Sequence, residues 1–204
     1  MLVRLIAGVT ALVLLAGPAG AGVPLDKIRE TVDDVLDVLA DESLQAPEQQ
    51  GARRARLRQA VYQRFGFEEM ARRSLGRHWR DLSGEQRQEF VGLFSDLLER
   101  SYVGKIEGAG AGSRIDYTRE TIDDEGFASV QTVVTNPLDS QFEVEYRLLQ
   151  RNGAASWEVY DIVIEGVSLI NNYRTQFNNV IHRNSYEGLV KQLRLKQEQE
   201  EALE

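Results

Sequence analysis

The chain has 204 residues, of which 24 are Lys or Arg and 32 are Asp or Glu, so its formal net charge is −8. This acidic balance argues against nucleic acid as the main partner, because affinity for nucleic acid depends on Lys and Arg side chains that neutralise phosphates. The sequence contains no cysteine, which excludes disulfides, thiolate metal ligands and an acylated cysteine of the lipoprotein type.

The first 21 residues have the pattern of a secretory signal peptide. Arg4 precedes an apolar run at residues 5–16, and the small residues at positions 19–21 resemble a cleavage site. The apolar run is shorter than the roughly 20 residues that cross a bilayer, which argues against a membrane anchor. We therefore expect residues 1–21 to be removed and the mature chain to be exported.

Apolar residues recur at helical spacing over the first half of the chain. This pattern predicts four helices, over residues 26–44, from Pro47 to Gly66, over residues 67–76, and from Ser83 to Gly108. Ser83 followed by Gln86 is a capping box, in which each side chain bonds the other residue's backbone N–H. In the second helix we expect the solvated face to carry Arg53, Arg54, Arg56 and Arg58.

From Ser113 onward apolar residues alternate with polar ones, which is the period of a half-buried strand. Four strands are predicted, around residues 115–117, 127–135, 142–148 and 157–164. The turn signals between them are too short for helical crossovers, so the strands should form an antiparallel meander. These signals are Asp123–Gly126, Asn136–Pro137 and Arg151–Gly153. Two helices follow, and Ser185 is expected to cap the last one.

This order of elements predicts an α+β fold, with helices packed on a twisted four-stranded antiparallel sheet. The roughly 180 residues after the leader are enough for one domain with a sizeable core. We assign this domain to residues 22–195 and expect residues 196–204 to be a charged, frayed tail.

Catalytic and metal-binding motifs are scarce in the sequence. Its two histidines, His78 and His182, are far apart and lack the spacing of a metal site. The glycine run Gly108–Gly112 follows a predicted helix and precedes a strand, which is the reverse of the order in a phosphate-binding loop. We therefore predict no catalytic residue, no metal site and no cofactor.

Asp161 is the one carboxylate whose position suggests chemistry. In a regular strand it shares a face with Trp157, Val159 and Val163. If that face is inward, desolvation raises the pKa of the carboxyl and makes it a candidate general base. The alternative, which we favour, is a carboxylate that pairs with an arginine or a tyrosine and fixes the sheet.

Two further groups of side chains have both a functional and a structural interpretation. The arginines Arg72, Arg73, Arg77 and Arg80 form a local basic patch, which can bind a lipid phosphate, an anionic membrane or an acidic partner. Ordinary solvated helix charge remains the alternative. The many aromatic and aliphatic side chains either fill a core or line a ligand cavity, and periodicity does not distinguish these two arrangements.

Long ordered strings of this sequence resemble one known family. They are FEEMARRSLGRHWR at residues 67–80, SGEQRQEFV at residues 83–91, Tyr102, WEVYDIVIEGVS at residues 157–168 and NYRTQF at residues 172–177. The chain resembles the MlaC family, also known as the toluene-tolerance family, from about residue 26 to residue 195.

This resemblance implies a periplasmic phospholipid carrier. Such a carrier works between an outer-membrane lipoprotein–porin complex and an inner-membrane ABC transporter of the Mla pathway, and so maintains the lipid asymmetry of the outer membrane. The resemblance also implies a partly NTF2-like fold that encloses the acyl chains of a diacyl phospholipid in an apolar cavity. We expect the carrier to be a monomer and not an enzyme.

On this basis we expect the cavity to be lined by Phe90, Phe94, Leu97, Tyr102, Phe127, Val144, Tyr146, Val163, Val167, Ile170, Tyr173 and Phe177. The patch Arg72, Arg73, Arg77 and Arg80 is the candidate site for headgroup or docking contacts. Two alternatives remain. One is an NTF2-like isomerase or dehydratase that uses Asp161 with Tyr160 or Tyr146, and the other is a lipid-free module that binds proteins.

Overall fold

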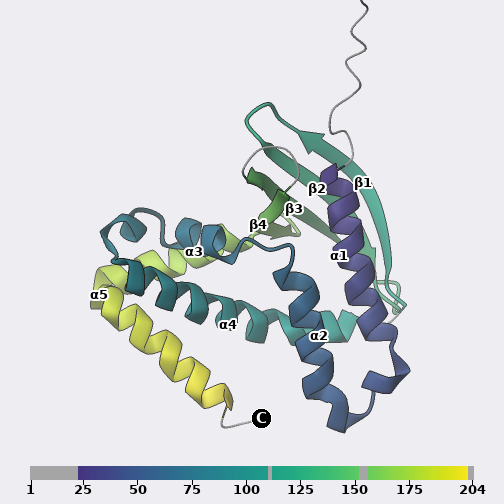
Figure 1. The fold of residues 1–204 in the computed structure, drawn as a ribbon, viewed down its shortest axis with the longest axis horizontal. Coiled ribbons are helices and arrows are strands. Elements are labelled where there is room, and N and C mark those ends of the chain that lie inside the picture. The colour runs from purple at the N-terminus through teal and green to yellow at the C-terminus, as the bar shows by residue number, and fades with distance from the viewer. Residues whose placement is uncertain (1–22, 110–111, 152–155, 202–204) are drawn as a thin grey trace, which may run out of the picture.

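A computed structural model describes residues 23–109, 112–151 and 156–201 (Figure 1). The predicted signal peptide and most of the predicted turn Arg151–Gly153 lie outside these ranges. No helix in the described part of the chain is long and apolar enough to span a membrane.

The first two predicted helices are present with shorter bounds. Helix α1 spans Val23–Ala40, a 3₁₀ turn follows at Glu42–Leu44, another lies at Pro47–Gln49, and helix α2 spans Gln50–Tyr62. The first helix ends four residues earlier than predicted because Asp41 begins a new turn, in which its carboxylate accepts a hydrogen bond of 2.9 Å from the backbone N–H of Ser43.

The next two helices agree with the sequence. Helix α3 spans Phe67–Leu75 and stops at Gly76. Gly76 has a φ of 56°, a backbone conformation that glycine adopts easily and that other residues rarely adopt. A 3₁₀ segment, Gly76–Asp81, leads to helix α4, Gly84–Ala109. The predicted capping box is confirmed: Ser83 N–H donates to Gln86 over 2.9 Å, and Gln86 N–H donates to the Ser83 hydroxyl over 3.2 Å.

The predicted meander is confirmed as a sheet with strand order β1-β2-β3-β4-β5, in which every neighbouring pair is antiparallel. The strands are β1 Arg114–Ile122, β2 Phe127–Thr135, β3 Gln141–Arg151, β4 Ser156–Ile164 and β5 Val167–Ser168. The fifth strand escaped prediction because its two residues are too few to show an alternating pattern.

Helix α5, Leu169–Glu201, contains the break that the sequence predicted at Ser185. There φ is 65° and ψ is 176°, so the chain turns back and returns along α4 (Figure 1). The helix continues as far as Glu201, within the charged segment for which we predicted fraying. Gln197 donates to Asp96 of α4 over 2.8 Å, and Arg194 pairs with Glu89.

Two apolar clusters form the core. One lies between α1 and the sheet, and the other lies among α3, α4 and α5 beside the sheet (Figure 1). Phe65 packs against both clusters. Its neighbours join the helices to β4, because Gly66 N–H donates to the Val159 carbonyl over 3.0 Å and Val159 N–H donates to the Arg64 carbonyl over 2.9 Å.

The prediction of a solvated arginine face on α2 is wrong for two of its members. Arg53 and Arg54 both pair with Glu107 of α4, at 2.9 Å and 3.5 Å. Arg58 reaches Glu99 of the same helix over 2.5 Å. These ion pairs hold α2 against α4. Helical periodicity does not predict them, because the paired residues are far apart in the sequence.

Candidate functional site

The face of the sheet that α1 covers, here called the inner face, is apolar. Its central residues are Val130, Leu148 and Val159, and Ile28 of α1 belongs to the same cluster. The start of α1 is fixed to the sheet by a hydrogen bond of 2.8 Å from Leu25 N–H to the Glu120 carboxylate. The centre of the inner face is therefore apolar and lies under α1.

The helical cluster beside the sheet is built on four aromatic rings. The ring centre of Phe94 lies 5.9 Å from that of Phe90, 5.4 Å from that of Tyr173 and 5.7 Å from that of Phe177. Three of the five ring contacts within this group are edge-to-face, an arrangement that aromatic quadrupoles favour. The cluster includes six of the predicted lining residues, namely Phe90, Phe94, Leu97, Ile170, Tyr173 and Phe177, and Tyr102 packs against it.

The remaining predicted lining residues do not lie together. Val144 and Tyr146 share the inner face, since they pair with Thr132 and Val130 of β2. Phe127 points the other way, because its ring contacts Tyr160 and the guanidinium of Arg73. Val163 lies on the face opposite to the inner face, because it alternates along β4 with the inner-face residues. It pairs with Glu145 and Ser168. Val167 is 62% exposed.

A β-bulge changes the interpretation of Asp161. Arg147 of β3 pairs with Asp161 of β4, but the next residue, Leu148, pairs with Val159, so Tyr160 is an extra residue on β4. Strict alternation therefore fails between Val159 and Asp161. Val159 stays on the inner face, and Asp161 joins Arg147 on the opposite face.

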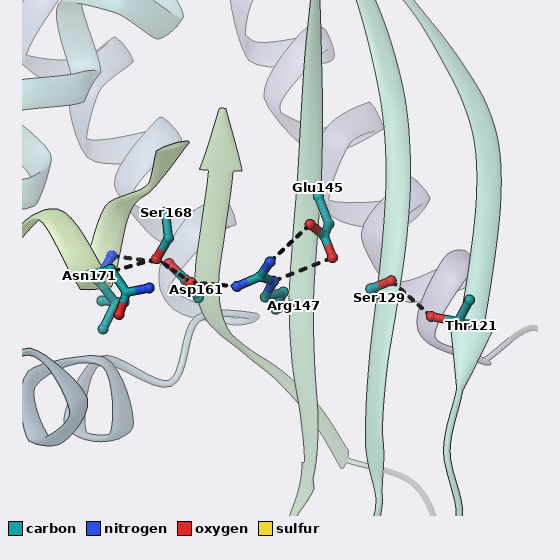
Figure 2. A network of polar contacts seen from close by, with 8 residues as sticks. Thr121, Ser129, Glu145, Arg147, Asp161, Ser168 and Asn171 are labelled. Atoms are coloured by element: carbon teal, nitrogen blue, oxygen red, sulfur yellow. Dashed lines mark hydrogen bonds and ion pairs between the residues drawn. The ribbon is translucent and has the colours of Figure 1, made fainter. Parts of the chain in front are cut away.

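Asp161 is 4% exposed, and both oxygens of its carboxylate accept hydrogen bonds from neighbouring elements (Figure 2). One oxygen accepts from the N–H of Ile170, in the first turn of α5, over 3.1 Å. The other accepts from the Ser168 hydroxyl over 2.6 Å and from Arg147 over 3.4 Å. The Ser168 hydroxyl in turn accepts from Asn171 N–H over 3.1 Å. The favoured prediction, a carboxylate paired with an arginine, is confirmed.

The four arginines of the predicted basic patch have different surroundings. Arg72 and Arg73 both bond Glu69, at 2.7 Å and 2.6 Å, and Arg73 also lies 4.0 Å above the ring of Tyr160. Arg77 is exposed and bonds Asn178, and Arg80 is exposed. Arg73 therefore helps to attach α3 to the sheet, whereas Arg72 is exposed and bonds Glu69 of its own helix, and Arg77 and Arg80 are exposed as well.

Glu69 should make stability depend on pH. It is 8% exposed, and its burial raises the pKa, but hydrogen bonds from Arg72 and Arg73 outweigh burial, so the pKa lies below the ordinary 4.5. A carboxyl whose pKa is lower in the folded state stabilises the protein above its unfolded pKa, and loses this contribution as pH falls through the folded value.

We therefore expect Glu69→Gln to lower the free energy of unfolding by about 1–3 kcal/mol at neutral pH. In urea titrations, the difference from wild type should shrink as the pH falls below 4.5. Glu68→Gln is the matched control, because Glu68 is the exposed neighbour, and it should change stability by less than about 0.5 kcal/mol. A Glu69→Gln difference that stays constant into acid would contradict this account.

Two tyrosines, Tyr117 and Tyr146, place polar atoms on the inner face. Tyr146 is among the lining residues predicted from the sequence, whereas Tyr117 is not. Burial raises the pKa of the Tyr117 hydroxyl to about 12, and burial also raises the pKa of Tyr146 strongly. The Tyr146 hydroxyl has a hydrogen bond with Thr132, whose own hydroxyl donates to the Val144 carbonyl over 3.1 Å. Tyr117 and Thr132 face each other across β1 and β2. Alternation placed Tyr117 in a strand but did not show that its hydroxyl would be buried.

Within the described ranges, no three His, Asp or Glu side chains gather in a way that would hold a metal ion. A cleft of about 460 Å³ lies between the start of α4 and the last turns of α5, where Tyr186, Val190 and Arg194 are among its walls. None of the predicted lining residues borders this cleft.

Comparison with known proteins agrees with the fold. The family model described as MlaC protein matches residues 29–195. A solved structure from Ralstonia solanacearum, described as a phospholipid-binding protein in complex with a phospholipid, superimposes with a TM-score of 0.72 at 28% sequence identity. The match covers 85% of this chain and 96% of that chain. The match over nearly the whole described domain shows that this chain belongs to the MlaC family.

Proposed function

We propose that this protein is a periplasmic phospholipid carrier, which shields the acyl chains of a diacyl phospholipid and delivers the lipid between membranes. The observation that carries the proposal is the solved neighbour: a protein with the same fold and 28% identity over most of this chain is in complex with a phospholipid. The apolar inner face and the aromatic cluster of α4 and α5 support it, because both are buried apolar regions, the kind of surroundings that hydrocarbon prefers to water.

Shielding is the physical problem that such a carrier solves. At about 0.8 kcal/mol per CH₂, two membrane-length chains cost on the order of 20 kcal/mol to hold in water, which forbids free diffusion of the lipid. Transfer from a bilayer to a protein interior exchanges one apolar environment for another. Its net free energy is therefore small, and lipid can move in either direction. ATP hydrolysis then belongs to the transporter and not to the carrier.

In this proposal the acyl chains lie between the inner face and the helical cluster. The predicted lining residues on these two surfaces are the candidates for contact, with Val144 and Tyr146 on the sheet and Leu97 and Tyr102 on α4. The partners are the outer-membrane lipoprotein–porin complex and the inner-membrane ABC transporter of the Mla pathway. The protein acts as a monomer, because a shuttle must diffuse between them.

Native mass spectrometry of the protein purified from the periplasm tests the proposal directly. We expect the dominant species to carry extra mass equal to one or more diacyl phospholipids, and organic extraction to release the same lipids. Protein that leaves the periplasm without lipid, and that takes up none from phospholipid vesicles, would overturn the proposal.

Docking is tested with the same preparation. Three members of the basic patch are exposed, and Arg72 among them is already paired with Glu69, so we propose Arg77 and Arg80 for contact with an acidic partner or a phosphate. The double variant Arg77→Glu, Arg80→Glu should keep its bound lipid in native mass spectrometry but transfer it more slowly to a partner complex. Unchanged transfer would remove these arginines from the docking surface.

A further inference from the structure

The hydroxyl of Tyr117 is buried, and no residue that the structure describes offers it a hydrogen bond. Buried hydroxyls in folded proteins nearly always have a partner, and leaving one without a partner costs free energy. The raised pKa of about 12 keeps this hydroxyl protonated at neutral pH. Tyr117 is thus a hydrogen-bond donor without an acceptor on the inner face.

The neighbouring polar groups do not explain this donor. Tyr146 has its hydrogen bond with Thr132, and Thr132 donates to the backbone of β3. Over the Tyr117 ring lies the guanidinium of Arg29 from α1, 5.0 Å from the ring centre, which is a contact with the ring face and not with the oxygen. None of these contacts gives the Tyr117 hydroxyl an acceptor among the described residues.

The surroundings restrict what the missing acceptor can be. Tyr117 packs against the apolar cluster of Ile28, Val130 and Leu148, which favours an acceptor that is itself joined to hydrocarbon. A phosphate would carry its charge out of water and toward Asp33, which already raises the pKa of Tyr117. A neutral acceptor attached to hydrocarbon suits the position on both counts.

We propose that Tyr117 donates a hydrogen bond to an ester carbonyl of the bound phospholipid. This inference rests on the proposed carrier function and adds a polar contact at the point where the acyl chains join the glycerol. The bond positions the lipid along the inner face, so it sets how deeply the chains enter the protein. It also satisfies a hydroxyl that is otherwise unpaired.

A comparison of two lipids against two proteins isolates this one bond. The lipids are dipalmitoyl phosphatidylcholine, which has ester carbonyls, and its dihexadecyl ether analogue, which has none. The proteins are wild type and Tyr117→Phe, which keeps the ring and removes the hydroxyl. Each protein is loaded with each lipid, and release to acceptor vesicles of phosphatidylcholine is followed in time.

We expect wild type to release the ester lipid about threefold to tenfold more slowly than the ether lipid, the range for one hydrogen bond. Tyr117→Phe should release both at the faster rate. Tyr160→Phe is the matched control, because Tyr160 contacts Arg73 on the opposite face, and it should retain the wild-type difference. In the lipid-free state, Tyr117→Phe should melt no lower than wild type, because no bond is lost.

Equal release of the ester lipid from wild type and Tyr117→Phe would overturn the inference and leave the carrier function standing. Failure of wild type to load either lipid would instead overturn the proposed function, and with it the inference. A lower melting temperature of lipid-free Tyr117→Phe would show that the hydroxyl already bonds water or protein, which also contradicts the proposal.

Discussion

Replacing Phe94 with Ala is expected to lower the free energy of unfolding of the lipid-free protein by about 3–5 kcal/mol. Phe94 is 0% exposed, and its ring contacts those of Phe90, Tyr173 and Phe177, so the shorter side chain leaves a cavity between α4 and α5. Urea unfolding followed by circular dichroism measures the loss.

The matched control for Phe94 is Leu138→Ala, because Leu138 is 85% exposed in the turn between β2 and β3, and its loss should stay below about 0.5 kcal/mol. The result also bears on where the lipid lies. A loss below about 1 kcal/mol for Phe94→Ala would contradict close packing and would indicate that the ring borders open space, as residues that line a cavity do.

Replacing Asp161 with Ala is expected to cost about 2–4 kcal/mol, the second largest effect. The carboxylate is the acceptor for Ile170 N–H and for the Ser168 hydroxyl, and it lies beside Arg147, so its removal leaves buried donors without partners where β4 meets α5 (Figure 2). Urea unfolding at neutral pH measures the change.

Two variants control for the Asp161 result. Asp161→Asn keeps one oxygen for Ile170 N–H and should lose less than the Ala variant. Glu145→Gln changes the less buried carboxylate beside Arg147 and should lose less than about 1 kcal/mol. If Asp161→Ala unfolds at the wild-type urea concentration, the junction of β4 and α5 does not depend on this carboxylate.

These variants also separate the carrier from the isomerase or dehydratase alternative. A general base needs an accessible carboxylate next to its substrate. Asp161 instead has both oxygens engaged by α5 and β3, on the face of the sheet away from the apolar cluster. We therefore expect Asp161→Asn to lower the free energy of unfolding. The isomerase or dehydratase alternative instead expects this variant to lose enzymatic turnover.

Much of the fold was predictable because it depends on neighbours in sequence. The capping box of Ser83 and Gln86, the end of α3 at Gly76 and the break at Ser185 all come from interactions or φ preferences within a few residues. The antiparallel meander followed in the same way, since short turns leave consecutive strands no other arrangement.

The candidate site was less predictable, since it depends on which faces meet. Alternation alone put Asp161 on one face with Val159, and the extra residue Tyr160 separated them. Phe127 was expected to line the cavity, but its ring lies under Arg73 because α3 packs there. A bulge and a helix position are outcomes of the whole sheet, and neither leaves a mark in local periodicity.

The long helices, the four long strands with their order and, through long ordered strings, the family could all be read from the sequence. Two features came from the folded chain alone: Arg53 pairs with Glu107, 54 residues away, and the Tyr117 hydroxyl is buried with no partner among the described residues. The difference lies in how far along the chain each interaction reaches. Backbone preferences and capping act over a few residues, whereas burial and ion pairing arise only when distant segments close on one another.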